Sequence, residues 1–234
     1  MHYRTAWIGW LCMAMGIGAS AKPARAEEGA SPRSPKAPVL AVEELPEKMR
    51  EPVSAILDHP TLHTVGPAET FSCDPATYYE FLEHPDRAVT AWRKLGAKCL
   101  TITDRGKGRF GWVDERGSDV HWDLIQTTPR VRVWYAEGQV RPNAWLPTVA
   151  FQAVVVLHIS EGRDADGRTF VRHQAELVVH SDNKTAALVA RILGPSAPRI
   201  AEQYVAQIQM FYSALSWYFY QHPEDAAEAM RKSK

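Results

Sequence analysis

Apolar and polar positions alternate with a period of two along most of the chain between residues 98 and 180. Such alternation is typical of strands that have one covered face. Short turn sequences such as Asp104-Arg105-Gly106 and Thr127-Thr128-Pro129 separate the segments, and short turns join antiparallel neighbours. The pattern therefore predicts a meander of six strands at about 98–103, 108–113, 118–126, 130–138, 148–160 and 169–180.

A further strand and two short helices are expected before this meander. Residues 62–71 predict a strand that Gly66-Pro67 breaks or bulges. Asp74-Pro75 is typical of a helix start, because the Asp side chain accepts from unpaired N–H groups and Pro tolerates the first helical position. His84-Pro85-Asp86 ends that helix and begins a second one, which Gly96 closes as a C-terminal cap. The two helices are expected to form a V.

The last part of the chain has the period of helices. One helix is expected over 184–193, ended by Gly194-Pro195, and a long one from Pro198 to about His222. Apolar residues three or four positions apart give the long helix one apolar face over about six turns. The residues on this face are Ile200, Tyr204, Ile208, Phe211, Tyr212, Leu215 and Phe219. The predicted sheet is the one partner large enough to cover that face.

This order of elements, with Asp74-Pro75-Ala76-Thr77-Tyr78-Tyr79-Glu80 opening the first helix after the first strand, resembles the START-like (SRPBCC) superfamily over about residues 62–222. That superfamily includes Bet v 1-type allergens, polyketide cyclases and lipid-transfer domains. The resemblance implies an α+β helix-grip fold, in which a curved antiparallel sheet of about seven strands wraps around the long helix. It also implies a cavity between them for an apolar ligand. Members are carriers, sensors or, less often, enzymes, and the fold does not choose among these roles.

Strand alternation sorts the predicted sheet into an inner and an outer face. The inner sets are aromatic and aliphatic, and together with the long helix they suit a hydrophobic ligand. The same side chains would equally well fill a solid core, and the sequence leaves both possibilities open. The candidate ligand-binding residues are Phe110, Trp112, Trp122, Val133, Tyr135, Glu137, Ala153, Val155, Leu157, His173, Leu177, Ile208, Phe211, Tyr212 and Leu215.

Two polar residues fall on the expected inner face, Glu137 and His173. Glu137 is expected inward together with Val133 and Tyr135, whereas Trp134 is expected outward. The polar pair is a candidate to anchor the polar head of a ligand, or to serve as the acid and base of a cyclase or hydratase; alternatively the two residues are hydrated and inert at the cavity mouth. We favour a non-catalytic carrier or sensor of a lipid-like or aromatic molecule. An enzyme that uses this pair and an interaction domain with a filled core are the alternatives.

The N-terminus has the pattern of a secretory signal peptide over residues 1–26. Arg4 precedes an apolar stretch, and Ala24-Arg25-Ala26 is the small-x-small pattern that a signal peptidase accepts. An uncleaved membrane anchor is the alternative, but the apolar stretch is shorter than the roughly 20 residues that span a bilayer. We expect a protein exported to the periplasm or the extracellular space, with a proline-rich tail or linker at 27–52, the domain at 53–222 and a C-terminal tail at 223–234.

Charge and motifs argue against several partners and cofactors. The chain has 27 basic and 27 acidic residues, and the loss of Arg4, Lys22 and Arg25 with the signal peptide leaves 24 basic residues against 27 acidic ones. This mild negative balance disfavours nucleic acid and anionic membranes as partners. No later segment approaches the length of a membrane span. The sequence has no complete metal-ligand motif, phosphate-binding glycine loop or nucleophile motif, so we expect neither a metal nor a cofactor.

Two cysteines, Cys73 and Cys99, remain after cleavage. An oxidising compartment favours a disulfide between them, and by the chain-entropy model it would stabilise the fold by about 3–4 kcal/mol. The sequence does not give their separation, so two buried thiols are an equal alternative.

Overall fold

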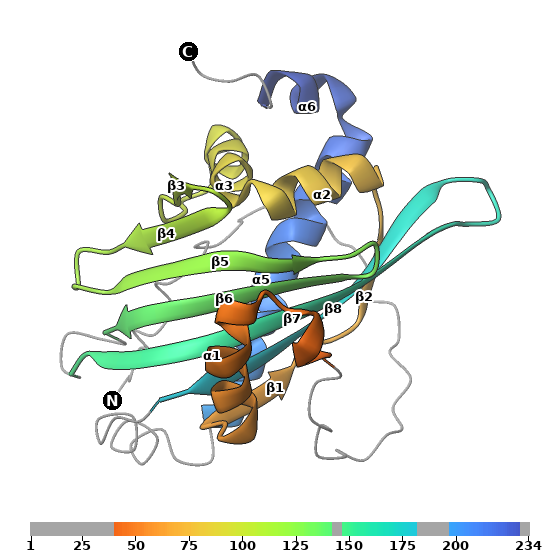
Figure 1. Cartoon of the computed structure of the whole chain (residues 1–234). Helices are drawn as coiled ribbons and strands as arrows, with labels where there is room; N and C mark the ends of the chain where they lie inside the picture. Colours follow the sequence, from red (N-terminus) through yellow and green to blue (C-terminus); the bar gives the residue numbers. More distant parts are fainter. Residues whose placement is uncertain (1–39, 142–146, 182–196, 230–234) are drawn as a thin grey trace, which may run out of the picture.

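The computed structural model describes residues 40–141, 147–181 and 197–229 and shows an α+β fold with one curved antiparallel sheet (Figure 1). The strands are β1 (Leu62–Val65), β2 (Glu69–Ser72), β3 (Thr103–Gly106), β4 (Arg109–Val113), β5 (Asp119–Thr127), β6 (Val131–Val140), β7 (Val149–Arg163) and β8 (Thr169–His180). The helices are η1 (Val42–Glu44), α1 (Glu47–Asp58), α2 (Pro75–Glu83), α3 (Pro85–Lys94), α5 (Ala197–Gln221) and α6 (Pro223–Ala229). The expected signal peptide and the helix expected at 184–193 lie outside the described residues.

The sheet has the order β1-β8-β7-β6-β5-β4-β3, and β2 pairs with β8 next to β1. The predicted break at Gly66-Pro67 is confirmed, because it divides the expected first strand into β1 and β2. Both halves remain on β8: Leu62 lies opposite Val179, and Glu69 lies opposite His173. The division makes eight strands in the described residues where about seven were expected.

The expected strand at 98–103 is wrong. Residues 98–102 form a connection without a strand partner; β3 begins only at Thr103, and its other residues are the Asp104-Arg105-Gly106 sequence predicted as a turn. Leu100 and Ile102 instead turn their apolar side chains into a cavity beside the sheet. Their apolar character therefore reflects contact with that cavity, not a place in the sheet ladder.

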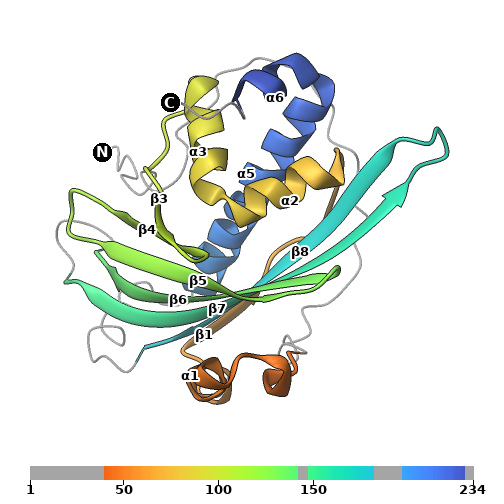
Figure 2. The same ribbon diagram turned by 45° about the horizontal axis from the view of Figure 1, so that its top comes forward.

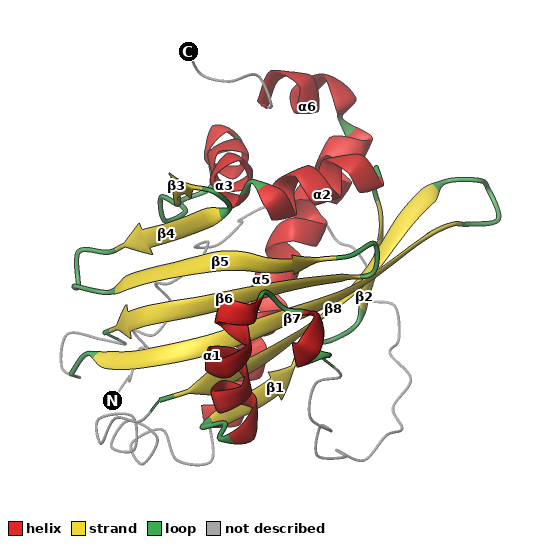
Figure 3. Ribbon diagram, in the orientation of Figure 1, coloured by secondary structure: helices red, strands yellow, loops and turns green. Residues whose placement is uncertain are grey.

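Helices α2, α3, α5 and α6 lie on the concave side of the sheet, as Figures 2 and 3 show. The predicted start of α2 is confirmed: the Asp74 carboxylate accepts from the Thr77 N–H at 3.0 Å. The V of α2 and α3 packs on α5, where the indole N–H of Trp92 donates to the Phe211 carbonyl at 3.1 Å. This contact fixes α3 to the middle of the long helix.

Helix α1 lies on the opposite, convex face of the sheet (Figure 2). Its buried residues Met49, Val53 and Ile56 are three or four positions apart, and with Leu45 they pack on apolar side chains of β6, β7 and β8. Residues 42–52 were expected to belong to a tail or linker. The packed structure includes them, because the apolar positions among their prolines and charges cover the back of the sheet.

The C-terminal stretch from residue 223 also begins as a helix instead of a tail. Pro223 occupies the start of α6, and the Tyr218 hydroxyl donates to the Asp225 carboxylate at 2.7 Å. Ala226 is partly buried against the cluster formed by α2, α3 and α5. Residues 223–229 thus extend the helical layer at one end of α5.

Candidate ligand-binding site

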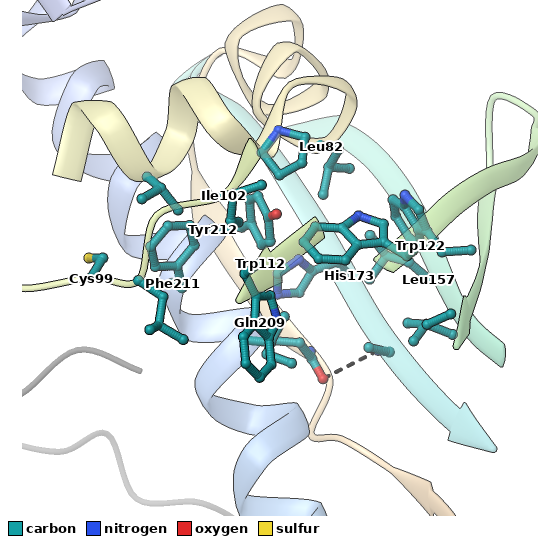
Figure 4. Close-up of a pocket in the computed structure, with 18 of the residues that line it drawn as sticks. Leu82, Cys99, Ile102, Trp112, Trp122, Leu157, His173, Gln209, Phe211 and Tyr212 are labelled. Carbon is teal, nitrogen blue, oxygen red and sulfur yellow. Dashed lines mark hydrogen bonds between the residues drawn. The ribbon is translucent and has the colours of Figure 1, made fainter. Parts of the chain in front are cut away.

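A cavity of about 280 Å³ lies between the concave face of the sheet and helices α2, α3 and α5. Figure 4 shows side chains from the sheet, from α2, from the connection after α3 and from α5 turned toward one space. The lining residues are Tyr78, Leu82, Pro85, Val89, Cys99, Leu100, Ile102, Trp112, Trp122, Trp134, Ala136, Val155, Leu157, His173, Ala175, Ile208, Gln209, Phe211 and Tyr212. Apolar and aromatic side chains dominate this wall.

Three indole rings form one side of the cavity. Trp112, Trp122 and Trp134 come from the adjacent strands β4, β5 and β6, and all three line the space. Trp122 lies opposite Ala136 in the β5–β6 pair, which leaves room beside the ring. Large flat rings next to a small residue make a surface that suits a planar apolar molecule.

Eight of the candidate residues line the cavity. They are Trp112, Trp122, Val155, Leu157, His173, Ile208, Phe211 and Tyr212. Ile208 is 46% exposed, so its side of α5 reaches the surface of the molecule. The structure therefore brings these side chains around one space, and their contact with a ligand remains a prediction.

Four further candidates are on the concave side but do not line the cavity. Phe110 is buried and stacks on Trp122, with ring centroids 6.2 Å apart. Leu215 is fully buried in the cluster of α2, α3 and α5. Ala153 and Leu177 share a sheet face with Val155 but fall outside the lining. Packing is the role that the structure gives these four residues.

The inward placement of Val133 and Tyr135 is wrong. Both belong to the cluster on the convex face, where α1 covers them. Their neighbours Trp134 and Ala136, which point the other way, line the cavity instead. Both faces of β6 are covered, so its apolar alternation does not distinguish the cavity side from the α1 side.

Glu137 also lies on the convex face, in a cluster with Tyr135, His121 and Gln152. The Tyr135 hydroxyl donates to Glu137 at 2.7 Å, and His121 Nε2 lies 3.0 Å from the other carboxylate oxygen. Gln152 donates to the Tyr135 oxygen at 2.9 Å. These bonds, that of Tyr135 first, lower the pKa of Glu137 despite its partial burial. The acid–base pair of Glu137 with His173 is therefore wrong, because the sheet separates them.

His173 has different partners, Tyr78 and Glu69. Its Nδ1 lies 2.7 Å from the Tyr78 hydroxyl, and its Nε2 lies 3.1 Å from Glu69 Oε2. The Ser213 hydroxyl donates to the same Glu69 oxygen at 3.0 Å. His173 is 1% exposed and Tyr78 is fully buried, so both polar groups are satisfied inside the protein.

Several lining residues were not among the candidates. Tyr78, Leu82, Pro85 and Val89 come from the helical V, whose apolar face the sequence does identify but whose partner it does not. Ala175 shares an alternating face with His173, which was a usable signal. Gln209 was not predicted, because a polar residue does not fit the apolar pattern used to choose the candidates. Its amide oxygen accepts from the Ala175 N–H and so joins α5 to the sheet backbone.

No disulfide joins Cys73 and Cys99, so the bridge considered for them is not formed. Cys73 is fully buried next to α2, and burial, with a smaller effect of Asp74, raises its pKa to about 12. Cys99 is partly exposed and lines the cavity. The two thiols therefore have different surroundings.

Within the described residues, no group of three or more His, Cys, Asp or Glu side chains is arranged to hold a metal ion. In the same part of the chain, none of the helices has the length and apolar character needed to cross a membrane.

No protein-family model and no curated protein matches the chain. Among solved structures, it is similar to a conserved protein from Geobacillus kaustophilus, with 14% identity over 71% of this chain and 97% of that one and a TM-score of 0.45. It is also similar to the di-domain ARO/CYC BexL from the BE-7585A biosynthetic pathway, with 13% identity over 72% of this chain and 53% of that one and a TM-score of 0.40. A third similar structure is that of Ara h 8.0201, with 13% identity over 67% of this chain and 95% of that one and a TM-score of 0.37. Likenesses this distant carry no argument about function.

Proposed function

We propose that this protein is exported and binds a hydrophobic, preferably aromatic, small molecule in the cavity between the sheet and α5, as a non-catalytic carrier or sensor. The observation that carries the proposal is the cavity of about 280 Å³ with its wall of aromatic and aliphatic side chains. Its volume lies just below the usual range for ligand pockets, about 300–1,000 Å³, and therefore suits a small ligand. The signal-peptide pattern of residues 1–26 supports export.

The wall favours binding through the transfer of apolar surface from water. Each square ångström of apolar surface that a ligand buries contributes about 25 cal/mol before the costs of association. Two of the polar side chains on the wall, His173 and Gln209, already have protein partners. A ligand that is mostly apolar therefore leaves few protein groups without a hydrogen bond.

The structure also offers a place of entry. Ile208 is 46% exposed on α5, and Cys99 is partly exposed on the connection after α3; both line the cavity. Neither side of this rim is a strand of the sheet, so it can widen without breaking a strand ladder. We propose that the ligand enters between α5 and this connection.

The proposal is tested by blocking the cavity. Ala136 lines it from β6, and Ala150 is exposed on the neighbouring strand β7. Ala136→Phe should reduce the affinity for 1-aminoanthracene, a neutral aromatic fluorophore, by at least tenfold, whereas the matched variant Ala150→Phe should leave it unchanged. Equal binding to wild type and to Ala136→Phe, or no binding to the wild type, would contradict a ligand site in this cavity.

Export is tested separately. Expression of the full chain in a bacterial host, followed by cell fractionation and mass spectrometry of the N-terminus, should find a mature protein that begins near Glu27 in the periplasm or the medium. A full-length chain that stays in the cytoplasm would contradict export and leave the ligand proposal in place.

A further inference from the structure

Four polar side chains form a hydrogen-bonded relay from the cavity wall to the surface. His173 on β8 lies between the Tyr78 hydroxyl of α2, at 2.7 Å, and Glu69 of β2, at 3.1 Å. Ser213 of α5 donates to the same Glu69 oxygen at 3.0 Å. Tyr78 and His173 line the cavity, whereas the Glu69 side chain is 27% exposed. Four separate elements thus hold this relay in place.

The direction of these hydrogen bonds follows from the chemistry of their partners. An ionised carboxylate only accepts, so the His173 Nε2 next to Glu69 carries the proton. In a neutral imidazole the other nitrogen is then an acceptor, and the Tyr78 hydroxyl donates to it. The Tyr78 oxygen still has accepting capacity, and no further hydrogen bond to it is found among the described residues. The relay therefore presents an acceptor at the cavity wall.

A second hydroxyl in the cavity, that of Tyr212, offers a hydrogen-bond donor. Tyr212 of α5 lines the cavity (Figure 4), and no hydrogen bond to its hydroxyl is found among the described residues. Burial, with a smaller effect of Asp86, raises the pKa of Tyr212, so the group stays protonated. A phenol O–H that lines a cavity is a donor with which a ligand can form a hydrogen bond.

We propose that the cavity selects an aromatic ligand that carries a hydroxyl group, with the Tyr78 oxygen accepting the ligand's hydrogen bond and the Tyr212 hydroxyl donating to the ligand's oxygen. This inference rests on the proposed function, since it requires a ligand in the cavity. A hydroxyl is a small uncharged group that both donates and accepts. An ether, a ketone or a carboxylate only accepts and would leave the Tyr78 oxygen unpaired.

The test compares 1-naphthol with 1-methoxynaphthalene, which differ in the hydrogen that the hydroxyl donates. Binding is followed by titration calorimetry and by quenching of the indole fluorescence of Trp112, Trp122 and Trp134. The wild type should bind 1-naphthol at least about tenfold more tightly, because the ether leaves a buried acceptor unpaired. Tyr78→Phe should reduce this preference to less than threefold and retain affinity for the ether, which also shows that the variant folds.

Tyr212→Phe should weaken both ligands by a similar factor, because the oxygen of either one accepts from Tyr212. Tyr135→Phe is the matched control: Tyr135 belongs to a Tyr–Glu–His cluster on the convex face, so this variant should bind both ligands as the wild type does.

Equal affinity of the wild type for the two ligands, or a preference that persists in Tyr78→Phe, would overturn the selection of a hydroxyl and leave the proposed function intact. Failure of the wild type to bind either ligand would count against the proposed function itself.

Discussion

The side chain of Gln209 lies against Gly66, where α5 crosses the break between β1 and β2. Its amide nitrogen donates to the Pro67 carbonyl at 2.8 Å, and its oxygen accepts from the Ala175 N–H at 3.3 Å. A Cβ at position 66 would lie 2.0 Å from the Gln209 Oε1 and 2.7 Å from the Val205 Cγ1. The interrupted first strand is thus the point at which the long helix approaches the sheet backbone.

Gly66→Ala is therefore expected to destabilise the protein. The new methyl group displaces the Gln209 amide and leaves buried backbone groups unpaired, at a cost of about 1–3 kcal/mol in the free energy of unfolding. Urea denaturation measures this cost. In a Gln209→Ala background the same substitution should cost less, because the smaller side chain leaves space. Equal costs in the two backgrounds would show that Gln209 is not the cause.

Packing of α1 on the convex face gives a second prediction. Val53 of α1 is fully buried against the sheet, whereas Val113 on β4 is 62% exposed. Val53→Ala should lower the free energy of unfolding by about 1–3 kcal/mol through lost contacts and a residual cavity. Val113→Ala, the same chemical change, should stay within about 0.5 kcal/mol of the wild type. Similar effects of the two variants would contradict a stable contact between α1 and the sheet.

The sequence predicts most of the fold because its strand and helix signals are local. Each of these signals acts on neighbouring residues, and the corresponding elements are present: a helix starts at Asp74-Pro75, the first strand breaks at Gly66-Pro67, and the long helix has one apolar face. What the sequence does not show is the cover on the convex face. The segment containing Leu45 and Met49 is rich in proline and charge, so its few apolar positions do not predict a packed helix without a view of the sheet they meet.

The candidate site shows a similar limit of prediction, because alternation along one strand does not always identify the face that meets the cavity. On β8, exposed Arg172 marks the outer face and His173 and Ala175 the cavity side. On β6 the charge of Arg132 suggests an outer face, yet its side chain is only 7% exposed, pairs with Glu83 and lies over the Tyr79 ring. The burial of Arg132 thus makes the inner and outer faces of β6 the reverse of those predicted from the sequence. Tertiary partners, which alternation does not encode, decide which face of a doubly covered strand meets the cavity.

The cluster around Glu137 predicts a pH dependence of stability. Hydrogen bonds from Tyr135 and His121 lower the pKa of Glu137 in the folded protein from its usual value of 4.5. A lowered pKa stabilises the fold above the usual value, and this contribution is lost as the pH falls through the lowered one. Glu137→Gln should therefore cost under about 1 kcal/mol at pH 7, because the cluster is partly exposed, and less still at pH 3. Urea denaturation at both values tests this; equal costs would contradict it.

Thiol labelling tests the different surroundings of the two cysteines, of which Cys99 lines the cavity. Cys73 is fully buried with its pKa raised to about 12, so almost none of it is thiolate at pH 8, whereas Cys99 is partly exposed at the cavity rim. A bulky maleimide should therefore label Cys99 at least tenfold faster than Cys73, as peptide mass spectrometry resolves for each residue. Saturation with 1-aminoanthracene should slow the labelling of Cys99 severalfold, because an occupied cavity leaves less room for the reagent. In Ala136→Phe, which blocks the cavity, added fluorophore should have no effect on the rate. Labelling of Cys99 that is insensitive to the fluorophore in the wild type would show that the ligand binds elsewhere.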